Sequence, residues 1–195
     1  GDPWRPADRL PAATVLNAFE LPWDGTGAAD AARLHVAAGA GEGRWAGAAL
    51  FVERGGALVP VGTAGPARAV MATLTAPLGG SPALMFEPDA AIELLCANSS
   101  AHLASVDGAA LAGGANRLLV GNEIVQFLAA EPLGGGHWRL SGLLRGRGAT
   151  EADALEGHAA GTCAVLLDER LLLFDAAILD PATERLAATG AGDAE

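Results

Sequence analysis

Positive charge is scarce in this 195-residue sequence, which has 12 basic residues against 23 acidic ones and a formal net charge of −11. A protein that binds nucleic acid over its surface needs a basic field to displace the counterions of the phosphates. The net negative charge therefore argues against nucleic acid as a partner, and anionic membranes are disfavoured for the same reason. No apolar run approaches the roughly 20 residues of a membrane-spanning helix.

Cysteine is equally scarce, with only Cys96 and Cys163 in the chain. Both lie in apolar, strand-like runs without a CxxC pair, and the four histidines show neither HxH nor HExxH spacing. These patterns give little support to a metal site, and we predict neither a metal nor a cofactor. We expect both thiols to be buried small side chains, and a disulfide is compatible only with strands that face each other.

Glycine, by contrast, is abundant, and its 27 residues divide the chain into short apolar runs. Gly55-Gly56, Asp107-Gly108 and the triplet 134–136 each separate two such runs, and glycine accepts the positive φ of a tight turn. A fourth hairpin is predicted at 168–170, between "CAVLL" and "LLLFD". Together they predict an all-β fold of mainly antiparallel hairpins, barrel-like or sandwich-like, with one or two short helices.

Two segments have the start signals of short helices. Thr150 precedes "EADALEG" as a candidate N-cap, and Asp180 is followed by Pro181 at the first helical position. One strand, within "TVLNAFELP", is expected in the proline-containing first part of the chain.

The positions of glycine and proline also suggest how the chain is divided into subdomains. We predict an extended arm or linker at 1–32, a β-hairpin subdomain at 33–86, a β-rich subdomain at 87–180 and a C-terminal tail at 181–195. Pro82 and Pro88 frame the segment at the central division.

No linear pattern recommends an enzyme. The glycine-rich segments lack the G-x-x-x-x-G-K-[ST] phosphate loop, and Ser141 lies outside any G-x-S-x-G elbow. Acidic residues at the predicted strand ends (Asp107, Glu123, Glu131, Asp168) are interpreted as solvated side chains. We therefore predict no catalytic residues.

Three arginines, Arg139, Arg145 and Arg147, concentrate positive charge in "WRLSGLLRGRGATE". They are candidates for contact with a partner or a glycan, because guanidinium groups pair well with carboxylates. The structural alternative is that Arg145 and Arg147 bond local carbonyls and acids where the strand turns into the helix. The tryptophans likewise are either core residues or an exposed sugar platform, for which Trp23, Trp45 and Trp138 are the candidates.

The segments Gly114–Asn116, Glu123–Phe127 and Arg139–Glu151 form a combination that resembles the tail-tip or baseplate hub proteins of tailed phages and gene transfer agents. Residues 45–56 and 103–111 fit the same family pattern, and the resemblance spans roughly 33–175. One arginine and one glycine of the family's usual R-R-G-T are missing from the segment 147–150. A role that needs paired arginines therefore loses support.

This resemblance implies a structural protein, represented here by its C-terminal region. Such proteins form a trimeric hub, contact neighbouring tail or baseplate proteins and the host surface, and are made in the bacterial cytoplasm for the virion. Some carry a separate glycosidase-like domain. The alternatives are therefore a carbohydrate-binding module that contacts host glycan, or an accessory domain of a glycosidase-like tail enzyme.

Overall fold

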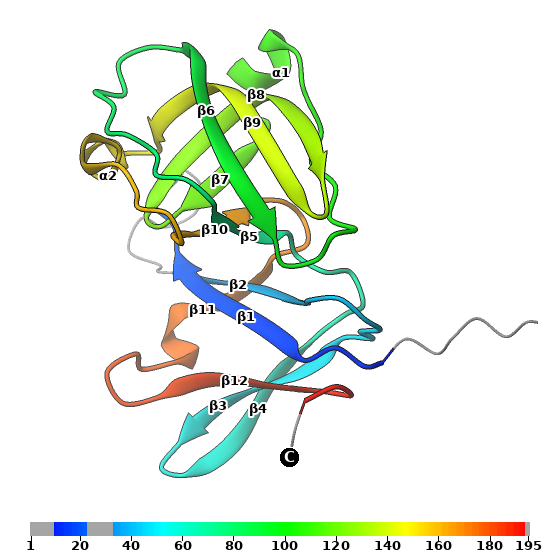
Figure 1. Cartoon of the computed structure of the whole chain (residues 1–195). Coiled ribbons are helices and arrows are strands. Elements are labelled where there is room, and N and C mark those ends of the chain that lie inside the picture. The colour runs from blue at the N-terminus through cyan, green and yellow to red at the C-terminus, as the bar shows by residue number, and fades with distance from the viewer. Residues whose placement is uncertain (1–9, 23–32, 194–195) are drawn as a thin grey trace, which may run out of the picture.

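The computed structural model of the chain describes residues 10–22 and 33–193. It is mostly β-structure in antiparallel sheets, with a closed six-stranded barrel and two three-stranded sheets. Figure 1 shows the barrel at one end of the molecule and the two sheets stacked beneath it. The all-β prediction is confirmed, and barrel and sandwich occur in the same chain.

The barrel closes in the strand order β10-β5-β6-β9-β8-β7. Its strands are β5 (Met71–Leu74), β6 (Glu87–Cys96), β7 (Arg117–Val120), β8 (Glu123–Gly134), β9 (His137–Arg147) and β10 (Cys163–Leu166). Phe127, Leu140 and Leu143 are fully buried inside it, and Trp138 packs in the same cluster. Because the sheet closes on itself, no barrel strand is left as an edge.

The other two sheets have the orders β1-β2-β11 and β12-β3-β4. Their strands are β1 (Thr14–Glu20), β2 (Arg33–Ala40), β11 (Leu172–Asp175), β3 (Ala48–Arg54), β4 (Ala57–Ala64) and β12 (Arg185–Gly190). We call these two sheets together the sandwich.

The sheet β1-β2-β11 is the middle layer and is covered on both faces. Ala37 of β2 packs with Met71 and Val165 of the barrel, while its neighbour Ala38 packs with Ala48 of β3. This follows from the period of a strand, in which successive side chains point to opposite faces. Through this alternation, β2 packs against the barrel with one face and against the sheet β12-β3-β4 with the other.

Two of the four predicted hairpins are confirmed. Gly55 and Gly56 connect β3 with β4, and the glycines 134–136 connect β8 with β9. All five of these glycines have positive φ, as tight turns require. The strand expected within "TVLNAFELP" is also confirmed, as β1.

The hairpin prediction at Asp107-Gly108 is wrong. Asp107 is the N-cap of helix α1 (Gly108–Ala112), and its Oδ1 accepts a hydrogen bond from the N–H of Ala110 at 2.8 Å. Aspartate favours both turns and N-caps, so the Asp-Gly pair alone does not separate them.

The hairpin prediction at 168–170 is wrong for a different reason. A turn is present, but β10 pairs with β5 and β7, whereas β11 pairs with β2. The turn thus carries the chain out of the barrel and into the middle sheet.

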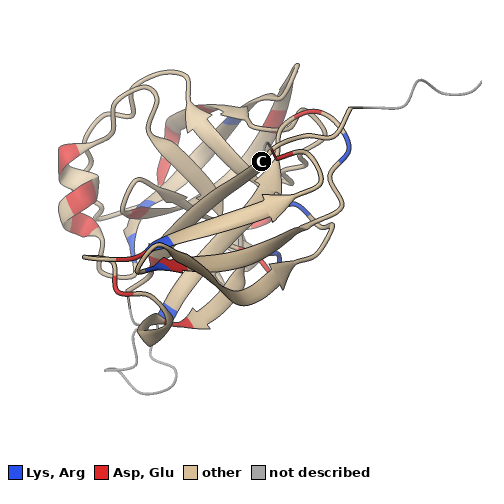
Figure 2. Cartoon of the chain, turned by 90° about the horizontal axis from the view of Figure 1, so that it is seen from below, with Lys and Arg blue, Asp and Glu red and all other residues tan. Residues whose placement is uncertain are grey.

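One of the two predicted helices is confirmed, as α2 (Glu151–Glu156) after Thr150. The acidic residues of this helix stand out as red bands in Figure 2. The helix predicted from Asp180 is wrong: Asp180 Oδ1 accepts from the N–H of Ala182 at 3.0 Å in a turn, and the chain then forms β12, which pairs with β3. A 3₁₀ turn, η1 (Ala176–Ile178), precedes that turn.

The division predicted near residue 86 falls between β5 and β6, which pair with each other in the barrel. Most of the predicted arm, 1–9 and 23–32, lies outside the described residues. Among the residues that are described, no helix is long and apolar enough to cross a membrane.

Candidate functional site

The arginine-rich end of β9 contains a β-bulge. Ile124 pairs with Arg147 and Gln126 pairs with Leu144, so that β9 has one residue more than β8 between these pairs. Gly146 within the bulge has a φ of +59°. Bulges are common at the ends of sheets, and the side chain of Arg145, at this bulge, is buried.

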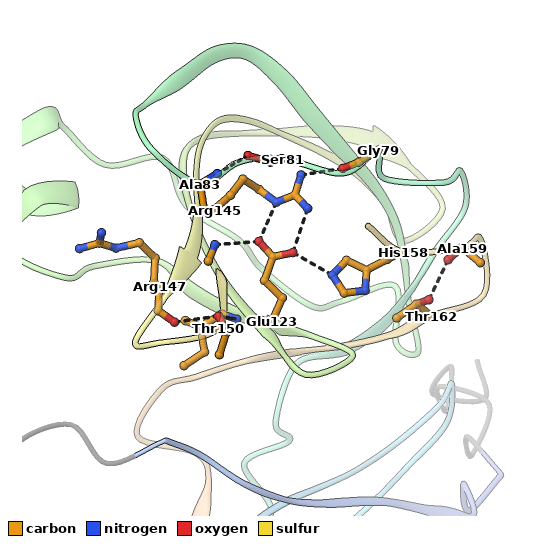
Figure 3. Close-up of polar contacts among 12 residues, drawn as sticks. Gly79, Ser81, Ala83, Glu123, Arg145, Arg147, Thr150, His158, Ala159 and Thr162 are labelled. Atoms are coloured by element: carbon orange, nitrogen blue, oxygen red, sulfur yellow. Dashed lines mark hydrogen bonds and ion pairs between the residues drawn. The ribbon is translucent and has the colours of Figure 1, made fainter. Parts of the chain in front are cut away.

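Arg145 forms a buried, two-pronged ion pair with Glu123 (Figure 3). Its Nε donates to Glu123 Oε1 at 2.7 Å, and its Nη2 donates to Oε2 at 2.9 Å. The side chains are 2% and 0% exposed, so water does not screen the pair. This parallel geometry is the strongest form of an arginine–carboxylate interaction.

Two further donors complete the hydrogen bonding of the Glu123 carboxylate. The backbone N–H of Gly146 donates to Glu123 Oε1 at 2.8 Å, and His158 Nε2 lies 2.8 Å from Oε2. Burial by itself would raise the pKa of Glu123. The hydrogen bonds from Arg145, Gly146 and His158 outweigh that effect and hold the pKa below its ordinary value.

The network ties together segments that are far apart in the sequence. Arg145 Nη1 donates to the carbonyl of Gly79 at 3.0 Å, and the backbones of Leu78 and His158 exchange two hydrogen bonds. Thr150 Oγ1 accepts from the N–H of Ile124 at 3.0 Å and donates to the carbonyl of Arg147. Thr150 therefore fastens α2 to β8 and makes no side-chain cap bond to the helix that follows it.

Gly146 is required here by space as well as by φ. A Cβ at this position would lie 2.7 Å from Ala83 Cβ and 3.0 Å from Glu151 Cα. The glycine thus lets three segments meet over the bulge.

These contacts indicate what the arrangement does. Each carboxylate oxygen of Glu123 already receives two hydrogen bonds, from donors held by β9 and by the segment after α2. A carboxylate in this state locks neighbouring segments together, and removing one partner would leave a buried charge uncompensated. The candidate site is therefore an internal clamp at one end of the barrel, which we call the Glu123 clamp.

Two features of the Glu123 clamp were not foreseen from the sequence. The interpretation of Glu123 as a solvated strand-end acid is wrong, because its side chain is fully buried and paired. His158 was given no role. Counting backward from the glycine turn at 134–136 brings Glu123 to the level of Gly148, the residue after β9. This signal indicates that an arginine of the motif lies near Glu123.

The other two motif arginines lie on the surface. Arg139 Nη1 is 3.8 Å from Glu93 Oε1, and both side chains are about half exposed. Arg147 is exposed, and its Nε donates to Gln126 Oε1 at 3.2 Å. Partner contact by Arg139 and Arg147 stays a prediction, whereas Arg145 has the structural role that was considered as the alternative.

The tryptophans that the structure describes are buried. Trp45 is 8% exposed, and its Nε1 donates to Thr14 Oγ1 at 3.1 Å. Trp138 is 7% exposed and meets His102 edge to face. Neither ring offers a free face for sugar stacking, and Trp23 lies outside the described residues.

A cavity of about 460 Å³ lies between β1 and the barrel, and both cysteines line it. Both thiols are free, but only Cys96 is buried; the expectation that Cys163 is buried as well is wrong. Burial raises the pKa of Cys96 to about 11, whereas Cys163 Sγ accepts from Asn17 Nδ2 at 3.0 Å. No group of metal-ligating side chains occurs among the described residues.

Comparison with known proteins identifies the barrel region. Residues 69–165 match the family model described as Rcc01698-like, C-terminal, and Rcc01698 is a Rhodobacter gene transfer agent protein. No curated protein matches the chain. The matched span begins two residues before β5 and ends one residue before the end of β10, so it coincides with the closed barrel. This part of the chain is therefore similar to the Rcc01698-like C-terminal domain.

Proposed function

We propose that the chain is a structural component of the tail tip or baseplate of a phage-like particle, either a prophage or a gene transfer agent. The observation that carries this proposal is the coincidence of the Rcc01698-like match with a complete folding unit, the barrel. The protein acts by assembling with neighbouring tail proteins and by contacting the host surface, without catalysis of its own.

The physical character of the barrel supports this role. Its most elaborate polar cluster, the Glu123 clamp, is turned inward and has its hydrogen bonds satisfied, which makes it a support for the fold. The sandwich, by contrast, has outer strands such as β1 and β4 that pair on one side only. Such edges are places where an extended segment of another protein adds by main-chain hydrogen bonding.

The test is an in-frame deletion of this segment from the gene in the cell that makes the protein. Particles are purified, counted by electron microscopy and assayed for DNA delivery. We expect tails that lack a complete tip and a large loss of delivery, and we expect an antibody to the chain to label the tip of parent particles. Particles that assemble and deliver DNA normally without the segment would refute the proposal.

A second measurement separates assembly from host contact. Substituting the surface arginine Arg139 by glutamate leaves the barrel interior untouched, because the side chain is half exposed. If the exposed face of β9 contacts the host, Arg139→Glu particles assemble with normal tips but adsorb poorly to cells. The same substitution at Arg54, on the sandwich, is the matched control, since that side chain is also about half exposed and pairs with one glutamate.

A further inference from the structure

The barrel presents one loop whose exposed apolar surface has no counterpart among the other described loops. Leu84, Met85 and Phe86 are consecutive, and they are 83%, 73% and 39% exposed. The remaining exposed large apolar residues of the described chain occur singly or, at Leu58 and Val59, as a pair on a strand. Contiguous exposed apolar side chains typically mark an interaction site. We call residues 84–86 the apolar loop.

The apolar loop is held firmly at its start. Ser81, 3% exposed, donates its backbone N–H to the carbonyl of Ala154 in α2 at 2.8 Å. Its Oγ accepts from the N–H of Ala83 at 3.0 Å and donates to a carboxylate oxygen of Glu87. Ala83 then adopts a φ of +54°, which turns the chain outward. Because Ser81 bonds to Glu87, residues on either side of the apolar loop are fastened together.

The end of the apolar loop is fixed by packing. The ring of Phe86 lies against Gly142 of β9, where a Cβ would come within 3.1 Å of the phenylalanine Cζ. Leu84 and Met85 therefore stand out from a rigid frame. A pre-ordered apolar projection loses little conformational entropy on binding, which favours a role in docking.

Acidic side chains lie near the apolar loop, on α2 and just after the loop in the sequence. Glu151 and Glu156 of α2 are exposed, and so is Asp89 just beyond the apolar loop. Figure 2 shows the acidic bands of α2 on the outside of the molecule. Leu155, 63% exposed, adds an apolar side chain from the same helix, whose backbone touches the start of the loop at Gly80. An apolar projection with an acidic rim is complementary to an apolar pocket with a basic rim.

We propose that the apolar loop docks into another protein of the same particle, at an apolar pocket bordered by arginine or lysine side chains. This inference rests on the proposed function for the existence of that particle. Leu84 and Met85 supply the buried centre of the contact, and the carboxylates of α2 supply its charged rim. The loop is thus the face by which the barrel is attached to its neighbour.

The first experiment is site-specific photocrosslinking in the full-length protein, in the cell that makes the particles. Benzoylphenylalanine replaces Met85 in one strain and Leu133, 51% exposed near the end of β8, in a control strain. We expect illumination of purified particles to yield a covalent adduct with a second, different polypeptide from position 85 only. The crosslinked surface of that polypeptide should include arginine or lysine residues.

The second experiment measures incorporation of variants into particles. Leu84→Asp with Met85→Asp should reduce the amount of the chain per particle at least tenfold, and Glu151→Lys with Glu156→Lys should reduce it by a smaller factor. Leu133→Asp, the control, should leave it unchanged. Thermal melting of the purified proteins tests folding, and we expect the double aspartate variant to melt with the parent because both side chains are exposed.

Several results would overturn the inference. A crosslink from position 85 to a second copy of this chain would make the apolar loop a self-association site, and a crosslink to lipid would make it a membrane contact. Normal incorporation of the double aspartate variant, or no adduct from position 85 in particles that contain the chain, would also end it. Absence of the chain from parent particles would instead refute the proposed function, so the two failures are distinguishable.

Discussion

The barrel and the sandwich differ in how their strands are distributed along the sequence. The barrel is made from one continuous segment, β5 to β10, and each of its strands has two hydrogen-bonded neighbours. The sandwich is made from both ends of the described chain: β12 joins β3, and β11 joins β2. Its pairings therefore require loop closure over most of the sequence, which costs more entropy than the local pairings of β8 with β9.

Their cores differ in the same direction. The barrel interior is filled by large side chains, among them Phe127, Leu140 and Leu143. The buried cluster between the sandwich sheets consists of alanines with one tryptophan, Trp45, which is 8% exposed. Leu50 and Val52 of β3 are fully buried large side chains outside this cluster. Alanine removes little apolar surface from water, so each alanine of this cluster contributes less to stability than a large side chain of the barrel interior. The comparison teaches that the family match has its boundaries where the continuous barrel segment has its boundaries.

The largest expected effect comes from emptying the barrel core. Phe127→Ala should lower the free energy of unfolding by about 3–5 kcal/mol, because a fully buried ring is replaced by a cavity. Leu50→Ala, at a fully buried position of β3, is the matched change in the sandwich and should cost about 2–5 kcal/mol. Urea unfolding measures both values.

Hydrogen exchange followed by mass spectrometry then assigns each loss to a region. We expect Leu50→Ala to accelerate exchange in β3 and β12 while the β8 and β9 amides stay protected. Equal acceleration of barrel and sandwich amides by both substitutions would mean that the molecule unfolds as one unit, and the distinction between the regions would disappear.

The Glu123 clamp gives the next effect. Glu123→Gln leaves Arg145 buried without its counter-charge, and the expected loss is about 3–5 kcal/mol. The corresponding ion pair of the sandwich, between Arg54 and Glu184, involves an arginine side chain that is 52% exposed. Arg54→Gln should therefore change stability far less. A loss at Arg54 as large as that at Glu123 would contradict the assignment of the clamp as the principal polar support.

The same clamp predicts how the barrel responds to acid. The folded-state pKa of Glu123 is below its ordinary value, so its contribution is complete above the unfolded-state pKa of about 4.3. That contribution is lost as the pH falls further, toward the folded-state pKa. We expect the difference in stability between the parent and Glu123→Gln to be constant from pH 7 to 5 and to shrink below that range. A difference that does not depend on pH would show that Glu123 acts by packing alone.

A feature of this structure can be predicted from the sequence when it depends on neighbouring residues, and not when it depends on residues far apart in the sequence. The hairpin turns at Gly55-Gly56 and 134–136 are local, because positive φ is a property of single residues, and both were predicted correctly. The pairing of β12 with β3 joins residues that are far apart in the sequence. No local pattern distinguishes β12 from the helix that Asp180 and Pro181 suggest.

The Glu123 clamp shows the same limit within the site. That Arg145 belongs to a distinctive motif was evident from the sequence, but its partner Glu123 is on another strand and meets it only when β8 and β9 are paired. A glutamate at a strand end is usually solvated, and burial becomes favourable only when four donors converge on it. The donor His158 arrives through the pairing of its backbone with Leu78, a contact between separate loops.

A matched pair of glycines separates backbone conformation from packing. Gly146 in the barrel and Gly55 in the sandwich have nearly the same φ, +59° and +58°. A Cβ at Gly55 meets nothing within 4 Å, whereas at Gly146 it would meet Ala83 Cβ at 2.7 Å. Gly55→Ala should thus cost about 1 kcal/mol, the cost of the left-handed conformation alone, and Gly146→Ala clearly more. Equal losses in thermal unfolding would show that the bulge has room to relax.

The last prediction concerns the two thiols, whose alkylation has the smallest expected effect on stability. It also tests the boundary between the barrel and the sandwich most sharply. Cys163 is exposed in the cavity between β1 and the barrel, whereas Cys96 is buried and its pKa is raised to about 11. Alkylation by iodoacetamide at pH 8 should therefore modify Cys163 in the native protein and leave Cys96 unmodified, because the thiolate is the reactive form. Mass spectrometry of the digested protein reads out both positions, and Cys163→Ser, the control, should take up no label. Labelling of Cys96 at the rate of Cys163 would mean that the barrel opens at β6 in the native state, and the barrel would then lose its place as the more stable region.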